Sequence, residues 1–469
     1  MFQIMNSLNR ASTSPNRRQV LSLGTLGLCS LNLANLLRAE ELSNQANSHK
    51  AVIFVHLDGG PPQHETIDPK PEAPAEIRGP FSGIATSIPG LQISELLPKM
   101  AANAQEFAFV RSLVGSAGRH DAFQCQSGFS FKDLKSLGGR PALGCTVTKL
   151  KGSPQDQTPA FVDMMQGRPL VRNSARSGFL GPAYQPFRPD ISSMFKRNLE
   201  NGMKGELKRL GPDHVVSLNL NEQLSESRID QRLALLNGLD HVRREIDQHG
   251  MMEAMDRFNQ QAVSILTSGK LADALDFNQE SPEVLKQYHL PEVKQGTQFV
   301  TSESSQATMK FLMARRLIEA GVRVVSLSIS EFDTHTNHFK RVQNILPILD
   351  HGMTSLVNDL KQRGMLDEVV IVAWGEFGRT PRVNAKGGRD HWPKVGPAIL
   401  AGGGLKTGQV IGQTDRLGAE VIDRPVTYKD VMATVYHCLQ IDPFGITIED
   451  PQGRPQYLLD TGTTIRELV

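Results

Sequence analysis

The sequence predicts an α/β fold with a mostly parallel central sheet flanked by helices. Three apolar, β-branched runs without alternation, Ala51–Leu57, Val322–Ile329 and Val369–Ala373, are typical of strands covered on both faces. Helical patterns lie between the last two runs, as parallel connections require. Each run leads directly into polar residues. Because ligands collect outside the carboxyl ends of the strands in such sheets, we expect a functional crevice there.

Length and composition favour one large domain at residues 50–469, with an insertion at about 137–300. The 469 residues would suit about three domains by length alone, but large α/β enzymes also reach this size as one body. The 39% hydrophobic and 21% charged content is that of an ordinary globular protein. The net charge is +2, and removing residues 1–39, which hold four arginines and no acid, leaves −2. We therefore expect no nucleic-acid partner.

Residues 1–39 resemble a twin-arginine export signal. Arg17 and Arg18 precede a modestly apolar stretch, Leu21–Ala34. A membrane anchor is the alternative, but polar residues interrupt a run that is already short for the roughly 20 apolar residues of a span. We expect cleavage near Ala34 or Ala39, no transmembrane span in the mature chain, and a periplasmic or extracellular location.

The cysteines exclude two kinds of site. Once Cys29 leaves with the signal, Cys125, Cys145 and Cys438 remain, an odd number without CxxC spacing. This pattern indicates neither a disulfide framework nor a thiolate zinc site. Any metal should therefore have oxygen and imidazole ligands.

The first strand ends at Asp58, which two glycines follow. An acid in this position could approach a ligand closely together with the backbone, although a turn aspartate that caps a helix fits the pattern equally well. His64 lies in the polar loop beyond. Further on, the pattern predicts a short helix at Ile93–Asn103 and a second short strand at Phe107–Val110.

A Gly/Ser loop after this strand, Arg111–Asp121, leads into a predicted helix that ends at Gly128. The first turn of such a helix favours anions, and His120 and Asp121 lie at its mouth. The alternative is a solvated loop in which Asp121 only caps the helix.

Residues 137–211 are rich in Gly, Pro, Arg and Asn and predict an insertion over the crevice rather than a folding unit. Arg168, Arg172 and Arg176 could reach an anionic substrate or belong to a surface loop. Residues 225–250 and 251–277 have helical patterns, in which the methionines 251, 252 and 255 are typical of core filler.

The densest set of possible ligands follows the strand Val322–Ile329, which comes after a helix at Ser302–Ala320. Asp333, His335 and His338 lie within six residues. A lone histidine would usually be structural, but this combination at a strand end favours a metal site. A helix at residues 344–363 then returns the chain to the central strand.

The central strand Val369–Ala373 is followed by a second polar cluster, which contains Glu376, Arg379, Asp390 and His391. A last strand at residues 398–401 precedes three glycines, which lack the GK[ST] ending of a phosphate loop and predict a turn. A helix at residues 428–440 and an ordinary tail at 465–468 complete the chain.

Carboxylates at converging strand ends would repel one another, and one or two divalent cations would relieve the repulsion. We therefore predict one or two ions of zinc, calcium, magnesium or manganese. Two such ions could clamp the oxygens of a phosphoryl or sulfuryl transfer, with Arg379 or Arg389 on the remaining oxygens. The predicted metal ligands are Asp58, Asp333, His335, His338, Glu376, Asp390 and His391.

Long motifs identify the chain as resembling the DUF1501 family. They are HLDGGPPQHETIDPKPEAPAEIRGPF, FDTHTNHF, WGEFGRTPRV, GRDHWP and ILAGGGLKTGQVIG, together with the paired arginines of the signal. This family is similar to the alkaline phosphatase and sulfatase superfamily, and the resemblance implies that fold. It also implies that Asp58 binds one metal, that Asp333 with His335 or His338 binds a second, and that His391 is the late histidine ligand.

Two departures from the superfamily pattern stand out. Phe377 stands where the superfamily has a histidine ligand, which implies that one metal site is altered or missing. The loop that should offer a Ser, Thr or Cys nucleophile offers His120 and Asp121, with Ser116 nearby, and the sulfatase pattern Cys/Ser-x-Pro-x-Arg is absent. A sulfatase with a formylglycine nucleophile is therefore disfavoured.

The leading hypothesis is an exported metallohydrolase of phosphate or sulfate esters, with His120 or His64 as general acid or base. Its substrate would be an anionic ester, for example a sulfated or phosphorylated glycan. The alternative is a noncatalytic, metal-stabilised protein that binds anionic glycans or protein partners. A nicotinamide oxidoreductase is disfavoured because no GxGxxG follows the first strand.

Overall fold

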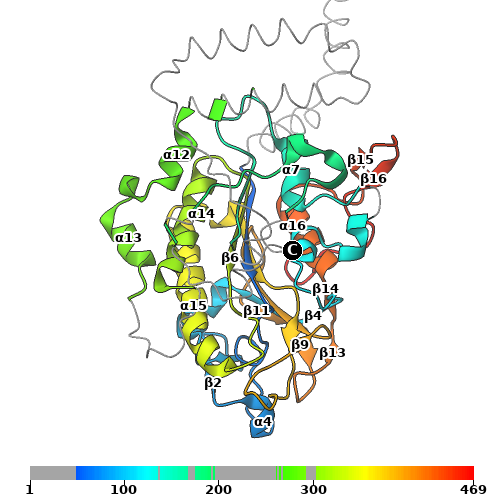
Figure 1. Cartoon of the computed structure of the whole chain (residues 1–469). Coiled ribbons are helices and arrows are strands. Elements are labelled where there is room, and N and C mark those ends of the chain that lie inside the picture. The colour runs from blue at the N-terminus through cyan, green and yellow to red at the C-terminus, as the bar shows by residue number, and fades with distance from the viewer. Residues whose placement is uncertain are drawn as a thin grey trace, which may run out of the picture. The chain divides into compact units, whose positions relative to one another are not determined.

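Eight strands form the central sheet of the computed structural model (Figure 1). Their order is β11-β4-β10-β7-β1-β6-β5, with β14 also paired to β4. All pairings are parallel except those of β10 with β4 and with β7, so the predicted, mostly parallel α/β sheet is confirmed. The strands are β1 (Ala51–Leu57), β4 (Ala108–Val114), β5 (Phe161–Met164), β6 (Val324–Ile329), β7 (Val369–Trp374), β10 (Gly396–Gly402), β11 (Gln409–Ile411) and β14 (Val426–Thr427).

The structure describes residues 49–135, 138–166, 175–191, 194–195, 260, 264–265, 268–291 and 303–469. Residues Lys50–Val469 form one compact unit. The predicted signal segment, the predicted helix at 225–250, most of the one at 251–277, and Arg168 and Arg172 lie outside the described residues. None of the described helices combines the length and the apolar character that a membrane span needs.

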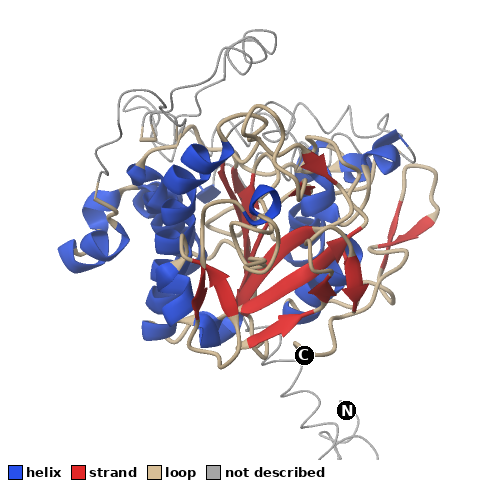
Figure 2. Ribbon diagram, turned by 90° about the horizontal axis from the view of Figure 1, so that it is seen from below, coloured by secondary structure: helices blue, strands red, loops and turns tan. Residues whose placement is uncertain are grey.

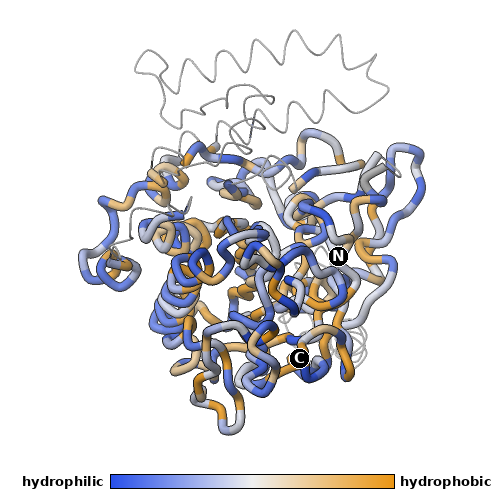
Figure 3. The backbone as a smooth tube through the Cα atoms, turned by 60° about the horizontal axis from the view of Figure 1, so that its bottom comes forward, coloured by the Kyte–Doolittle hydropathy of each residue, from blue (hydrophilic) through white to orange (hydrophobic). Residues whose placement is uncertain are grey.

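Helices cover both faces of the sheet because β1 is apolar on both faces. Ala51, Ile53 and Val55 belong to one core cluster, whereas Val52 and Phe54 belong to the other. Figures 1 and 2 show the two helical layers, and Figure 3 shows apolar segments between them. The first layer contains α5 (Pro98–Ala102), α12 (Lys270–Leu275), α13 (Pro282–Tyr288), α14 (Met309–Glu319) and α15 (His338–Gln362), and the second contains α6 (Phe123–Ser127), α7 (Leu143–Lys151) and α16 (Tyr428–Cys438).

Short elements decorate the loops. Four two-stranded ribbons pair β2 (Gly83–Ala85) with β3 (Gln92–Ser94), β8 (Gly378–Arg379) with β9 (His391–Trp392), β12 (Gln413–Thr414) with β13 (Val421–Asp423), and β15 (Thr447–Glu449) with β16 (Pro455–Tyr457). The remaining helical turns are α4 (Ala75–Arg78) and the 3₁₀ turns 104–106, 131–135, 178–180, 182–184, 277–279, 305–308 and 366–368.

Two predictions before the central strand are corrected. The short helix predicted at Ile93–Asn103 is present, but its predicted start is wrong, because β3 ends at Ser94 and α5 starts only at Pro98, a residue suited to a first helical turn. Residues 137–211 are not merely an insertion, since they contain α7 and β5, which pairs with β6. The four-residue β5 includes the buried Asp163, so its apolar signal in the sequence is weak.

Two further predictions change at the ends of elements. Helix α15 begins at His338 rather than at residue 344, and it continues through Pro347. The predicted tail is part of the core, because Ile465 and Leu468 are fully buried.

The topology brings five segments to one edge of the sheet. Strands β7, β1 and β6 are neighbours and parallel, so the residues after them, Glu376, Asp58 and Asp333, lie at the same edge. Strand β4 runs in the same direction and leads to His120. Strand β10 runs the opposite way, so the segment that enters it brings His391 to this edge.

Candidate metal centre

The turn after β1 depends on a glycine. Gly59 adopts φ 106°, and a Cβ atom there would lie 2.3 Å from the backbone nitrogen of Asp333. Only a residue without a side chain allows the ends of β1 and β6 to approach this closely. The N–H of Gly59 donates to Oε1 of Glu376 at 2.9 Å, so the same turn also holds the residue after β7.

Four side chains at this edge form what we name the outer group: His120, Asp333, His335 and His391. Nε2 of His335 and Nε2 of His391 lie 2.9 and 3.2 Å from Oδ1 of Asp333. The two ring nitrogens are 3.1 Å apart, and Nε2 of His120 lies 3.2 Å from Oδ2 of Asp333. One ligand atom of each residue therefore surrounds a common point, as the ligands of a metal ion do.

Asp390 pairs with one outer-group histidine. Its Oδ1 lies 2.6 Å from Nδ1 of His335, and Asn384 Nδ2 donates to its Oδ2 at 3.3 Å and to the carbonyl of His335 at 3.1 Å. If His335 is neutral with its proton on Nδ1, Nε2 turns a lone pair toward Asp333 and His391. Asp390, predicted as a ligand, thus lies behind His335 rather than in the outer group, the arrangement by which carboxylates orient metal-bound histidines.

Three buried side chains form the inner group: His56, Asp58 and Glu376. Nε2 of His56 lies 3.3 Å from Oε2 of Glu376, and both side chains are almost fully buried. His120 connects the two groups, since its Nδ1 lies 3.1 Å from Oε1 of Glu376 while its Nε2 faces Asp333.

The charges of the side chains themselves stabilise the cluster. Burial acts to raise the pKa of Asp333 and of Glu376, but the hydrogen bonds of His120 and the neighbouring rings of His391 and His56 outweigh it, and both pKa values fall well below the ordinary range. Burial acts to lower the pKa of His120, but its hydrogen bonds to Asp333 and Glu376 raise this pKa to about 9. A proton on His120 thus compensates the carboxylates, and a bound cation would displace it.

The family model described as "Protein of unknown function (DUF1501)" matches residues 49–469. The chain belongs to the DUF1501 family. A search of curated proteins finds no match.

Several solved structures match most of the chain, at low identity and low TM-score. The PsFucS1 sulfatase from Pseudoalteromonas sp. has 12% identity and a TM-score of 0.35, and the match covers 86% of this chain and 70% of that one. The lipoteichoic acid synthase LtaP from Listeria monocytogenes has 11% identity and a TM-score of 0.35, with 85% and 74% covered. The C-terminal periplasmic domain of EcEptC from Escherichia coli, in complex with Zn, has 10% identity and a TM-score of 0.34, with 87% and 92% covered. At such TM-scores the likeness says nothing about the activity of the DUF1501 chain.

Arg379 supports the centre rather than facing a substrate. It is fully buried, and β8 places it opposite His391 of β9. Its guanidinium donates to Oδ1 of Asp333 at 2.8 Å and to the carbonyls of Gly59, Gly60 and Arg389. The expectation that Arg379 holds ester oxygens is therefore corrected, because its donors are already committed to the protein.

Arg389 and His338 also belong to the scaffold. Arg389 is fully buried and donates to Oε1 of Glu65, and His338 lies with Nε2 2.9 Å from Oε2 of the same carboxylate. Nδ1 of His338 lies 2.6 Å from Oγ1 of Thr334. The first turn of α15 thus directs His338 away from the outer group, which corrects its prediction as a ligand.

His64, predicted as an acid or base, is placed elsewhere. It is buried, and its Nε2 lies 2.8 Å from the carbonyl of Leu417. Burial lowers its pKa to about 4, so the ring is neutral near pH 7. In the described structure His64 belongs to neither group, whereas His120, predicted with it, joins the outer one.

Phe377, which stands where the sequence comparison led us to expect a histidine, packs against two rings of the outer group. Its ring stacks on His391 with centroids 4.2 Å apart, and its centroid lies 5.3 Å from that of His120. It therefore orients two outer-group rings instead of binding an ion.

Sequence reasoning missed His56, because one histidine inside a buried strand usually has a structural role. Its spacing from Asp58 was an available signal, since residues two apart in a strand project to the same face. Asn384 was also missed, and an asparagine in a Gly-rich loop carries no distinctive signal.

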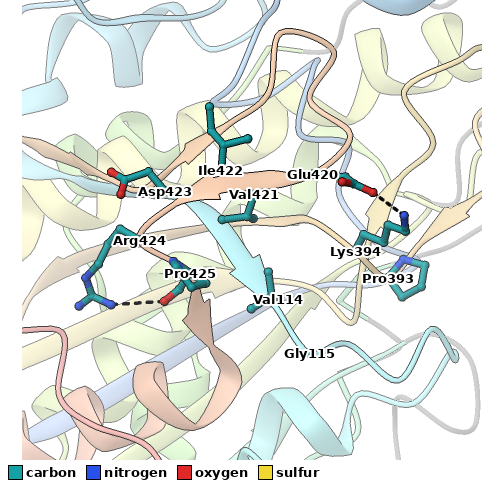
Figure 4. Close-up of a pocket in the computed structure, with 10 residues that line it drawn as sticks. All are labelled: Val114, Gly115, Pro393, Lys394, Glu420, Val421, Ile422, Asp423, Arg424 and Pro425. Atoms are coloured by element: carbon teal, nitrogen blue, oxygen red, sulfur yellow. Dashed lines mark hydrogen bonds and ion pairs between the residues drawn. The ribbon is translucent and has the colours of Figure 1, made fainter.

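A surface pocket of about 540 Å³ adjoins the segments that carry His120 and His391 (Figure 4). The end of β4 and the residues after β9 form part of its wall, and the 60% exposed Ile422 forms an apolar part. Lys394 and Glu420 pair across its rim at 2.6 Å. The pocket is lined by Val114, Gly115, Pro393, Lys394, Glu420, Val421, Ile422, Asp423, Arg424 and Pro425.

Proposed function

We propose that this DUF1501 protein is an exported, metal-dependent hydrolase of phosphate or sulfate esters, with a catalytic ion held by the outer group. The observation that carries the proposal is the convergence of imidazole nitrogens on the carboxylate of Asp333. His335 commits one nitrogen to Asp390, and its other nitrogen lies about 3 Å from both Asp333 and His391. Lone pairs that face one another in this way are stabilised by a cation at their centre.

The donor set narrows the choice of ion. Three imidazoles and one carboxylate suit zinc, which accepts nitrogen and oxygen ligands in a four-coordinate site. Calcium and magnesium prefer oxygen ligands and fit the outer group less well. We therefore expect zinc to bind the outer group most tightly.

The chain's own side chains would prepare this ion for an ester. A bound ion would polarise an ester oxygen and lower the pKa of a bound water. Arg379 holds Asp333, Asp390 holds His335, and Phe377 packs against His391. The side chain of His335 is 44% exposed, so an anionic ester can approach from solvent, with its organic part directed to the pocket beside Ile422. A sulfated or phosphorylated glycan has this chemistry, and the export signal would place the protein in the periplasm or outside the cell.

One observation favours a second candidate, a noncatalytic metal-stabilised binding protein. The hydroxyl of Ser116, the nearest candidate nucleophile in the loop before α6, donates to the carbonyl of Glu376 at 2.5 Å. The loop therefore offers no uncommitted serine, and hydrolysis would depend on activated water.

A histidine variant tests the proposal. His335→Ala should remove one zinc ion per chain and lower turnover at least about 100-fold, because activity depends on a fully ligated ion. Elemental analysis and a panel of phosphate and sulfate esters provide the measurements. His437→Ala changes an exposed histidine of α16 and is the matched control, for which we expect unchanged metal and activity.

The remaining outcomes decide between the two candidates. A protein that holds its ion but turns over no ester in the panel is a binding protein. A protein that binds no ion when zinc is supplied during folding contradicts the metallohydrolase.

A further inference from the structure

We infer that the inner group, His56, Asp58 and Glu376, is a second metal site whose imidazole ligand comes from strand β1. The inference extends the proposed function from one ion to two, but it stands on different residues and can fail separately.

The register of the sheet assembles these ligands. His56 and Asp58 are two residues apart in a strand direction, and His56 pairs with Trp374 of the parallel strand β7. Glu376 follows Trp374 by the same two residues, so it lies level with Asp58. One ligand atom of each residue lies within 4.8 Å of the others, and all three side chains are buried.

The surroundings of His56 also indicate a bound cation, independently of the clustering of the three side chains. Its ring is fully buried, and among the described residues neither ring nitrogen has a hydrogen-bond partner. Nε2 points toward Oε2 of Glu376 at 3.3 Å but without hydrogen-bond geometry, and that oxygen also has no hydrogen-bond partner in the described structure. An imidazole and a carboxylate oxygen buried in this state are costly, unless a cation accepts both lone pairs.

The other oxygen of Glu376 is already occupied. Oε1 accepts the N–H of Gly59 at 2.9 Å and lies 3.1 Å from Nδ1 of His120. If Nε2 of His120 binds the outer ion, the proton of this ring is on Nδ1 and is donated to Glu376. The same tautomer therefore serves both sites and leaves Oε2 for the inner ion.

Charge supports the same conclusion. With neutral imidazoles, Asp58 and Glu376 place two negative charges in a buried space, and one divalent ion neutralises both. Two carboxylates and one imidazole suit zinc or manganese. The chain thus regains from His56 the imidazole that Phe377 does not provide. The competing arrangement is a single proton shared between His56 and Glu376.

Metal counting on the signal-free chain, folded with zinc or with manganese, tests the inference. We expect two ions per chain in the wild type, one in Glu376→Gln, one in His335→Ala and none in the double variant. Because the inner group is buried, the ion that His335→Ala retains should leave to EDTA at least about tenfold more slowly than the ion that Glu376→Gln retains. His56→Gln is the second variant, and thermal melting confirms that each variant is folded before its ions are counted.

Asp163→Asn is the matched control, because Asp163 is a buried carboxylate of β5 that belongs to neither group. It should melt at a lower temperature but keep two ions. One ion in the wild type, with Glu376→Gln and His56→Gln retaining it, would overturn the inner site and favour the shared proton. One ion that survives His335→Ala but not Glu376→Gln would support the inner site and overturn the outer one.

Discussion

Two regions of the molecule concentrate charge, and they resolve it in opposite ways. Between α13, α14 and α15, each guanidinium donates to a carboxylate. Nε of Arg315 donates to Asp359 at 2.8 Å, and Nε of Arg363 donates to the other oxygen of the same carboxylate at 2.7 Å. This helical network is made of Arg315, Arg316, Arg363, Glu280, Glu319 and Asp359, so three positive charges meet three negative ones.

At the candidate metal centre the number of carboxylates exceeds the number of cationic side chains. Within the inner and outer groups and their described partners Arg379 and Asp390, four carboxylates face one guanidinium if the histidines are neutral. Nε2 of His335 and Nε2 of His391 also lie 3.1 Å apart, and both face Oδ1 of Asp333. Both regions are dense in charge and partly buried, so density does not distinguish a ligand site from an ion-pair network. An unmatched set of acceptors does.

The largest expected effect is a loss of folding stability when the helical network is disrupted. Asp359→Asn should lower the free energy of unfolding by about 3 kcal/mol, because it removes one partner of a buried ion pair. The value lies at the low end for such pairs because Glu280 and Glu319 still contact Arg315. Urea unfolding measures the loss, and metal content should stay unchanged.

Chelation of the wild type instead disturbs the candidate metal centre and leaves the helical network intact. EDTA should remove the ions and lower the melting temperature, since ligands that bind only the folded state stabilise it. If Asp359→Asn also lost metal, the two regions would be coupled and the contrast would be wrong.

A smaller effect, on zinc affinity, is expected from Asp390, which contacts the outer-group residue His335. Asp390→Asn should weaken zinc binding by about 10- to 100-fold, because an amide holds the proton of His335 less firmly than a carboxylate does. Competition with a chromophoric chelator measures the affinity. Asp423→Asn changes an exposed carboxylate of β13 and should leave the affinity unchanged. An unchanged affinity in Asp390→Asn would mean that His335 needs no orienting partner.

Much of the fold and the general place of the site could be predicted from the sequence. Unalternating apolar runs mark strands covered on both faces, and the polar residues after them, Asp58, Asp333 and Glu376, do lie at one edge of the sheet. The four-residue strand β5 escaped this reasoning because so short a run, interrupted by Asp163, gives little periodic signal.

The roles of individual side chains could not be predicted, because they depend on which way each loop turns. His335 and His338 are three residues apart and equally suited to bind a metal, but α15 begins at His338 and turns it toward Glu65. Arg379 has the chemistry to hold a substrate, but tertiary contacts use its donors. His56 required the register between β1 and β7, which local sequence does not contain.

The smallest effect concerns the pocket that Ile422 lines, which would hold the organic part of an ester. Ile422→Glu should raise the KM of a bulky ester about threefold to tenfold, since the apolar contact of one partly covered side chain contributes about 1 kcal/mol. Ile422 is 60% exposed, so stability and metal content should not change. Tyr457→Glu, at a 53% exposed position in β16, is the control for an added surface charge.

Steady-state kinetics on a bulky ester and a methyl ester distinguish loss of the apolar contact from charge repulsion, because a pocket that binds the organic group affects only the bulky ester. An equal change for both esters would show that the added charge repels any anionic substrate and that the pocket does not select its organic part.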